Sequence, residues 1–443
     1  MKKQPFRTKA GISRNVIALG IVSLFTDAAS EMIYPLVPIF VTFLGSGALV
    51  LGVIEGVAET TAAMLKLVSG IISDKTGKRK SLVVLGYGIS TLVRPLTGIV
   101  SASWQIVFVR MIDRVGKGIR TAPRDALIAA STDDRIRGKA YGFHRAMDHA
   151  GAVIGPVLAI SVLMLLVLGF DMHDPVPVLR WTFVLAIIPG LFAVLTLVIF
   201  VKDKAEPITS APKLDFSLRN FDRNFLSYLG IVFLFTLGNS SDAFLLLRAR
   251  DILNQSQYVL SFIYSVPLFK SMVGNLNADT QKVLIDILYL PLVWAFFHMI
   301  KVMFSTRLGS LSDKIGRKIV INIGWGIYVF VYVAFAFLDR LSEGGQIIAT
   351  FILFAIYALY YAFCEGAEKA LVADLVRTEM RGSAFGLYNF AIGLGALPAS
   401  LIFGVLYQKF GAVIAFGTGA LLACLAMILL FLGVKEPHRN LGS

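Results

Sequence analysis

The residues best suited to chemistry lie in one stretch of the chain, between Arg110 and Asp125. At about 100° per residue along a helix, all of its ionisable side chains fall within an arc of roughly 140°. These are Arg110, Asp113, Arg114, Lys117, Arg120, Arg124 and Asp125. Apolar runs at 99–109 and 126–130 flank this charged face. Ionisable side chains in a membrane span face a bundle interior or a water-filled path, so the stretch predicts a polar cavity.

Two interpretations of this charged face are open. In the first, Arg110, Arg114 and Lys117 hold a carboxylate or phosphate group of a substrate. Three acidic residues are expected to line the same cavity: Asp113, Asp242 and Glu365. In the second interpretation, the cations pair with acidic residues and only position helices. The spans of the first half hold eight Lys/Arg and seven Asp/Glu, and this near balance favours pairing, because an unpaired buried charge is costly.

Proton coupling would need a carboxylate or histidine whose protonation responds to water access or to substrate. Asp27 and Glu31 lie one turn apart near the middle of the first apolar segment and are the best-placed candidates. The further candidates are Glu55, Glu59 and Asp148. Each of them could instead be a fixed partner of an arginine. The sequence shows no catalytic cluster and no His/Cys metal spacing, so it predicts neither an enzyme nor a metal or other cofactor.

Composition indicates the class of protein that must position these residues. The chain has 443 residues, of which 56% are hydrophobic and 16% charged, and its mean hydropathy is +0.75. Soluble domains are about 25% charged. Apolar runs of roughly 20 residues recur along the chain, which is typical of an all-α polytopic membrane protein. The net charge of +14 resides in short loops and indicates membrane orientation rather than nucleic-acid binding.

Twelve spans are expected, six on either side of a polar stretch at 202–223 that holds five Lys/Arg, four Asp/Glu and two prolines. They are 15–43, 48–72, 81–100, 104–130, 139–168, 177–201, 224–247, 285–306, 319–338, 346–373, 383–408 and 411–434. This predicts a six-helix bundle at 1–201, a linker at 202–223 and a second bundle at 224–443. The loops after even-numbered spans are basic, which places both termini and the linker in the cytoplasm.

Internal repetition supports two homologous halves. Residues 19–26 reappear with one change at 229–236, the loop 70–80 matches 309–318, and 137–142 matches 381–386. The separations are 210, 239 and 244 residues. The increase from 210 to 239 places an insertion between the seventh and eighth spans, near 254–282, on the outer side. Repeats of this kind enclose a site near the membrane midplane.

The repeated loop, Gly-xxx-Asp-xx-Gly followed by basic residues, resembles motif A of the major facilitator superfamily. With the two-bundle layout, the chain is identified as a member of that superfamily. The resemblance implies alternating access around a cavity lined by the first, fourth, seventh and tenth spans. It also implies that the two loops act as latches of the outward-open state, although a solvated loop that only sets topology would look alike. The latch residues are Gly70, Asp74, Gly77, Arg79, Gly309, Asp313, Gly316 and Arg317.

Two further motifs bear on the resemblance. Gly151-xxx-Gly155-Pro156 is similar to part of the antiporter motif of drug–proton exchangers, but lacks its following glycine pair. The run 116–126 resembles a signature of an uncharacterised prokaryotic branch. The repeat alignment also sets one charged pair opposite another of reversed order, which predicts either cytoplasmic gate elements or interfacial salt bridges. These residues are Arg124, Asp125, Glu368 and Lys369.

Together these features predict a monomeric, multi-pass secondary active transporter of the cell membrane. Its expected partners are the lipid bilayer, protons and a small molecule. The expected substrate is an anionic or zwitterionic organic solute, for example a carboxylate-type metal chelate. The alternative is a multidrug-type proton antiporter that exports cationic amphiphiles through Asp27, Glu31 and Glu55. A channel would need a continuous polar pore, and the second half offers little for one.

Overall fold

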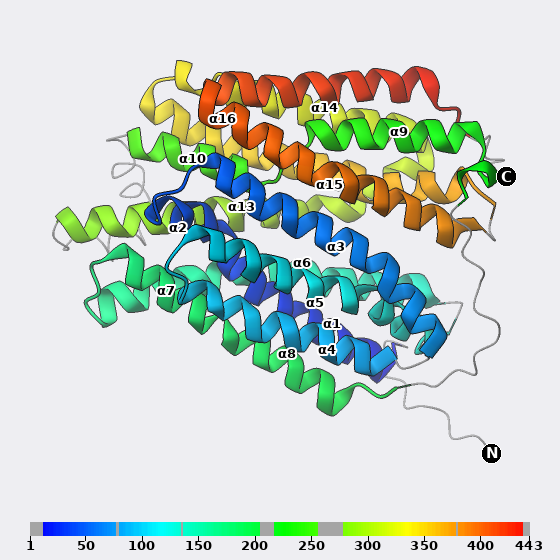
Figure 1. The fold of residues 1–443 in the computed structure, drawn as a ribbon, viewed down its shortest axis with the longest axis horizontal. Helices are drawn as coiled ribbons and strands as arrows, with labels where there is room; N and C mark the ends of the chain where they lie inside the picture. The colour runs from blue at the N-terminus through cyan, green and yellow to red at the C-terminus, as the bar shows by residue number, and fades with distance from the viewer. Residues whose placement is uncertain are drawn as a thin grey trace.

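The computed structural model describes residues 12–76, 79–133, 136–203, 217–255, 278–377 and 380–436. Their regular secondary structure is helical (Figure 1). The helices of the first half are α1 (Arg14–Ile33), η1 (Tyr34–Leu36), α2 (Val37–Phe43), α3 (Ala48–Thr76), α4 (Arg79–Val93), η2 (Arg94–Gly98), α5 (Ser103–Ala130), α6 (Arg137–Met164), η4 (Leu165–Gly169), α7 (Pro175–Leu185) and α8 (Ile187–Phe200).

The second half begins with the short turn η5 (Leu218–Asn220). Its other helices are α9 (Arg223–Gly238), α10 (Ala243–Gln255), α13 (Ala278–Ile315), α14 (Arg317–Ala336), η6 (Leu338–Arg340), α15 (Glu343–Asp374) and α16 (Arg381–Gly433). The expected insertion near 254–282 lies for the most part at 256–277, outside the described residues. In Figure 1, α1 begins and α16 ends at the same end of the molecule.

The helices form two groups, α1–α8 and α9–α16, which lie side by side in Figure 1. In the first group α1 packs on α6 and α8, and α5 packs on α3 and α4. In the second group α9 and α14 pack on α16, and α13 and α14 pack on α15. The two groups meet mainly where α3 packs on α16 and α6 packs on α13. These two helix pairs flank the space between the groups.

Nine helical stretches among the described residues are long and apolar enough to cross a membrane. The expected spans 81–100 and 104–130 also form helices, α4 with η2 and α5, but are not among the nine. In α5 the reason is its charged face. The 53-residue α16 counts once, although Gly411 inside it has a φ of 80° and interrupts the helix. Such a backbone favours glycine, and the break coincides with the boundary expected between the last two spans.

Proline shapes the helix that carries the candidate proton sites. The N-cap residue Ser13 accepts a hydrogen bond from the backbone N–H of Val16, and α1 then runs to Ile33. Pro35 lies in the 3₁₀ turn that follows, and α2 continues the span. Proline removes a backbone donor and interrupts the α-helical pattern at this point. Tyr34, in the same 3₁₀ turn, lines the cavity between the two helix groups.

Candidate functional site

A polar cavity lies between the two helix groups and has three adjoining chambers. The large chamber, of about 910 Å³, is lined by residues of α1, α3, α4, α5, α6, α13 and α15. The middle chamber, of about 330 Å³, shares Asp27 and Lys117 with it. The aromatic chamber, of about 350 Å³, shares Tyr34 and Asp242 with the middle one. Tyr361 of α15 lines all three, so the chambers lie next to one another.

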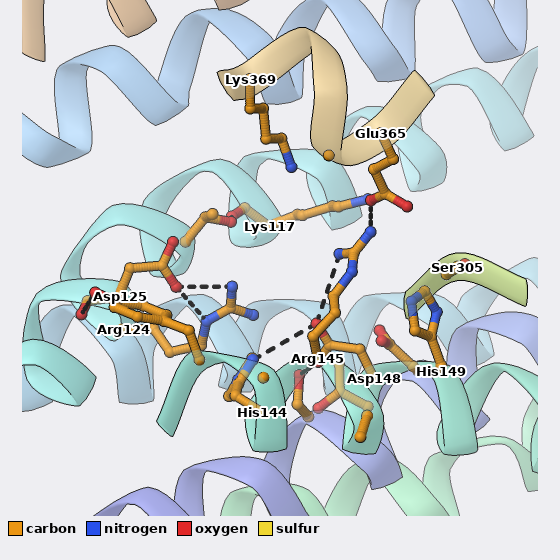
Figure 2. Close-up of a pocket in the computed structure, with 18 of the residues that line it drawn as sticks. Lys117, Arg124, Asp125, His144, Arg145, Asp148, His149, Ser305, Glu365 and Lys369 are labelled. Carbon is orange, nitrogen blue, oxygen red and sulfur yellow. Dashed lines mark hydrogen bonds and ion pairs between the residues drawn. The ribbon is translucent and has the colours of Figure 1, made fainter. Parts of the chain in front are cut away.

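The charged face of α5 is directed at this cavity. Lys117, Arg120, Arg124 and Asp125 line the large chamber (Figure 2). The middle chamber is lined by Arg110, Arg114, Lys117 and Arg120. Glycines on the other side of α5 permit close helix packing, because a methyl group on Gly116 would lie 2.6 Å from the carbonyl oxygen of Gly86 in α4. The helix is thus apposed to α4 on one side and lines the cavity with the other.

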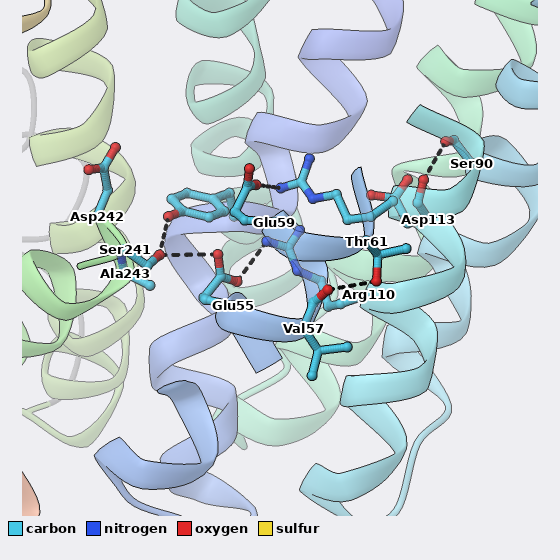
Figure 3. Close-up of polar contacts among 12 residues, drawn as sticks. Glu55, Val57, Glu59, Thr61, Ser90, Arg110, Asp113, Ser241, Asp242 and Ala243 are labelled. Carbon is cyan, nitrogen blue, oxygen red and sulfur yellow. Dashed lines mark hydrogen bonds and ion pairs between the residues drawn. The ribbon is translucent and has the colours of Figure 1, made fainter. Parts of the chain in front are cut away.

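Three ion pairs lie at the start of that face: two of its arginines bind glutamates of α3, and its own Asp113 binds an arginine of η2. Arg110 Nη2 lies 2.7 Å from Glu55 Oε1, and both side chains are buried (Figure 3). Arg114 pairs with Glu59 at 3.3 Å. The third pair joins Asp113 to Arg94 of η2 at 2.8 Å. Of the three cations proposed for substrate binding, Arg110 and Arg114 therefore already have carboxylate partners on α3.

Three lysines of the large chamber have no such partners. Lys66, Lys117 and Lys369 line the large chamber, and within the described residues none of their ammonium groups forms a hydrogen bond or ion pair. Arg120 has neutral partners, since it donates to Ser90 Oγ at 2.6 Å and lies over the ring of Tyr87. Lys117 is distinctive because it also lines the middle chamber. The positive charge of α5 that has no carboxylate partner therefore lies at Lys117 and Arg120, closer to the C-terminal end of the helix than Arg110 and Arg114.

The five proton-coupling candidates also differ in whether their carboxylates have partners in the protein. Glu55 and Glu59 are held by arginines, and Glu31 accepts a hydrogen bond of 2.7 Å from Trp294 Nε1, with His298 at 3.7 Å. Asp148 accepts a hydrogen bond from Ser23. It also lies 3.6 Å from His144 and 3.8 Å from Arg145. Asp27 lines both the large and the middle chamber, and its carboxylate has no hydrogen bond or ion pair in the part of the chain that the structure describes.

Side chains from both helix groups meet across the cavity. Arg145 of α6 forms an ion pair with Glu365 of α15 (Figure 2). Lys301 of α13 lies 3.7 Å from the same carboxylate. Ser241, just before α10, donates to Glu55 Oε2 at 3.2 Å (Figure 3). The hydrogen bond from Trp294 to Glu31 is a third such contact. Trp294 escaped the sequence analysis because it lies in an apolar run, where its indole N–H was the only polar signal.

The remaining acidic residues expected in the cavity lie in the second helix group. Asp242 accepts hydrogen bonds from the hydroxyls of Tyr357 and Tyr361, at 2.6 and 2.9 Å. The pairs predicted as gate elements are arranged within their own groups. Arg124 pairs with its neighbour Asp125 at 2.9 Å. Glu368 accepts from Trp325 and Tyr388, at 2.9 and 2.7 Å.

The latch motif is described only in part. Gly70 lies in α3, Arg79 begins α4, and Gly309 lies in α13. Gly316 has a φ of 101° between α13 and α14, and the backbone N–H of Arg317 donates to Glu436 at 2.7 Å. Gly77 and the side chains of Asp74 and Asp313 lie outside the described residues. The latch therefore stays a prediction.

The family model described as Major Facilitator Superfamily matches residues 19–397 and 292–442. An uncharacterized MFS-type transporter of Methanocaldococcus jannaschii is 35% identical over 422 residues, which are 95% of this chain and 94% of that protein. Among solved structures, a D-xylose-proton symporter has a TM-score of 0.67 at 16% identity, covering 96% of this chain and 98% of that one. A mutant of the nucleoside transporter NupG has a TM-score of 0.62 at 15% identity, covering 94% of this chain and 98% of that one.

Proposed function

Because the chain belongs to the Major Facilitator Superfamily, it is a membrane transporter rather than an enzyme, and we propose that it carries a small anionic or zwitterionic organic solute in exchange with or together with protons. The observation that carries the proposal is Lys117, a cavity-lining cation with no carboxylate partner among the described residues. A buried charge is costly without a countercharge, so an anionic group of the solute would be stabilised there.

We propose that transport occurs by alternating access between residues 1–201 and 224–443, joined by the linker 202–223. Twelve membrane crossings fit the break of α16 at Gly411 and the helical form of the two charged spans that hydropathy leaves out. Both ends of the chain would lie in the cytoplasm of a plasma-membrane protein. Side chains from both helix groups of one chain line the cavity, and we propose a monomer as the working unit.

The large chamber reaches the ends of the helices. Arg124 lies near the C-terminal end of α5, and Tyr141 lies near the start of α6. In the proposed topology this end faces the cytoplasm, so the structure would correspond to a state open to the inside. The cross-group contacts of Glu31 and Glu55 would then close the cavity at the outer side.

Proton coupling is proposed for Asp27. It is the candidate carboxylate whose side chain has no fixed partner in the described ranges, so its protonation can respond to the solute and to water access. The partners of the other carboxylates weaken the cationic-drug alternative. That alternative rests on three carboxylates, and two of them, Glu31 and Glu55, already bind side chains of the protein.

A thermal-shift screen of the purified protein tests the substrate class. The panel would hold carboxylates, phosphate esters, metal chelates and cationic amphiphiles, each measured with wild type, Lys117→Gln and Lys409→Gln. Lys409 is an exposed residue of α16 outside the cavity and serves as the matched control. We expect anionic compounds to stabilise wild type and Lys409→Gln, and to bind Lys117→Gln at least tenfold more weakly. Stabilisation by cations that Lys117→Gln leaves intact would contradict the proposal.

A further inference from the structure

The two ends of the cavity carry charge of opposite sign. Among its described lining residues, the large chamber has six cations, Lys66, Lys117, Arg120, Arg124, Arg145 and Lys369, and four carboxylates, Asp27, Asp125, Asp148 and Glu365. The aromatic chamber has four carboxylates, Glu55, Glu59, Asp242 and Glu368, and no described Lys or Arg in its lining. An anion alone would be favoured at the first end and disfavoured at the second.

Two of the carboxylates in the aromatic chamber form no ion pair within the described residues. Glu55 and Glu59 are neutralised by Arg110 and Arg114, which lie behind them. Asp242, by contrast, accepts only from the hydroxyls of Tyr357 and Tyr361. Glu368 accepts only from the indole of Trp325 and the hydroxyl of Tyr388. Within the described residues neither of these two carboxylates forms an ion pair, and their donors are all uncharged.

The walls between these carboxylates suit a cationic group. Phe235, Trp325, Tyr360 and Tyr361 all line the aromatic chamber. Phe235 and Trp325 are stacked with ring centroids 4.1 Å apart, and Tyr360 and Tyr361 lie 4.9 Å apart. Aromatic rings beside an acidic group are a recognition site for ammonium ions through cation–π attraction. The ring of Tyr361 already has one such contact, with Lys301 Nζ 4.2 Å from its centroid.

The middle chamber connects the two kinds of charge. Asp242 lines the aromatic and middle chambers, and Lys117 lines the middle and large ones. A solute in the middle chamber can therefore reach both side chains. We infer that the substrate is a dipolar ion whose ammonium or other cationic group lies at Asp242 and Glu368, and whose carboxylate or phosphate lies at Lys117. Such a molecule supplies the countercharge that each end of the site lacks.

This inference rests on the proposed transport function and narrows its substrate class. A panel of chain-matched ligands tests it on the full-length protein by thermal shift and calorimetry. The dipolar members are β-alanine, γ-aminobutyrate, ε-aminohexanoate and their N-trimethyl forms. Each is compared with the carboxylate and the amine of the same chain length. Different lengths are needed because the spacing of the two charges must match the site.

We expect at least one dipolar ligand to bind tenfold or more tightly than both of its single-charge counterparts. Asp242→Asn and Glu368→Gln should remove this advantage, while the simple carboxylate should bind at least as tightly as it does to wild type, because a negative charge has been removed from the site. In Asp242→Asn the amide oxygen can accept from both tyrosine hydroxyls, which already share Oδ1. In Glu368→Gln the amide oxygen can accept from Trp325, and the amide nitrogen can donate to the hydroxyl oxygen of Tyr388, so folding should be preserved. Asp251→Asn is the matched control, because Asp251 also accepts a tyrosine hydroxyl, from Tyr407, but lies outside the three chambers.

Three results would contradict different parts of the proposal. If no dipolar ligand at any length binds more tightly than its matched carboxylate, while carboxylate binding still depends on Lys117, the dipolar inference is overturned and the anion transporter stands. If Lys117→Gln changes the binding of no ligand in the panel, the proposed function fails as well. An advantage of the dipolar ligands that survives both Asp242→Asn and Glu368→Gln would also overturn the assignment of the cationic pole.

Discussion

Gly155 of α6 lies directly against Glu31 of α1, since a methyl group on Gly155 would be 2.8 Å from the Cβ of Glu31 and 2.7 Å from the carbonyl oxygen of Ala28. Gly151 makes the same kind of approach one turn earlier, against Leu24 and Asp27. The motif that resembles part of an antiporter signature thus packs α6 closely against α1 beside its two acidic residues. Small residues permit this close approach of helices in a membrane.

Gly155→Ala is therefore expected to push α6 away from α1. Overpacking of a tight contact destabilises by about 1–3 kcal/mol, and the displacement should weaken the contact between Glu31 and Trp294. Thermal unfolding in detergent and transport in proteoliposomes would measure the two effects. Gly230→Ala in α9 is the control, because a methyl group there meets no atom within 4 Å. Equal unfolding temperatures for the two variants would show that the contact imposes no constraint.

The ion pairs that Arg110 and Arg114 form with α3 should differ in their contribution to the stability of the fold. In the pair of Arg110 with Glu55 the side chains are 7% and 2% exposed, whereas Glu59, the partner of Arg114, is 48% exposed. Glu55→Gln leaves a buried charge unpaired, which costs about 3–5 kcal/mol. Glu59→Gln should cost no more than about 1 kcal/mol, because solvent screens the pair. Chemical denaturation of both variants would test this order, and a larger loss for Glu59→Gln would contradict it.

Asp27→Asn should separate solute movement from proton coupling. The amide cannot exchange a proton at neutral pH, so exchange of labelled solute between equal concentrations should persist. Accumulation driven by a pH gradient should fall to the level of empty liposomes. Asp251→Asn, outside the cavity, should behave like wild type in both assays. Gradient-driven accumulation that survives in Asp27→Asn would move the coupling site to another carboxylate.

Transport should depend on opposite charges at positions 145 and 365, which now form an ion pair. Glu365→Arg would place three cations together, with Arg145 and Lys301, and transport should drop at least tenfold. The reversed pair, Arg145→Glu with Glu365→Arg, restores one attraction between the helix groups. We expect it to recover part of the transport rate, with a coupling energy of about 0.5–3 kcal/mol in a double-mutant cycle. Additive losses would instead mean that the two residues act independently.

The sequence by itself determined the class of protein, the family and several local features. Hydropathy indicated a polytopic helical protein, and the repeated loops indicated the superfamily that the comparisons confirm. The boundary expected between the last two spans also matches a real interruption, at Gly411 inside α16. These features could be predicted because they depend on residues close together in the chain, such as a helical period.

Only the tertiary structure decided which charges have partners. Helical periodicity places Arg110, Arg114 and Lys117 on one face, but it does not reveal that α3 neutralises the first two. Nor does it reveal that Glu31 receives a hydrogen bond from a tryptophan 263 residues away. Charge compensation depends on side chains that meet only when the two helix groups pack together. The physical reason is that the interaction of two charges depends on their separation in space and their burial, neither of which is written in the order of the residues.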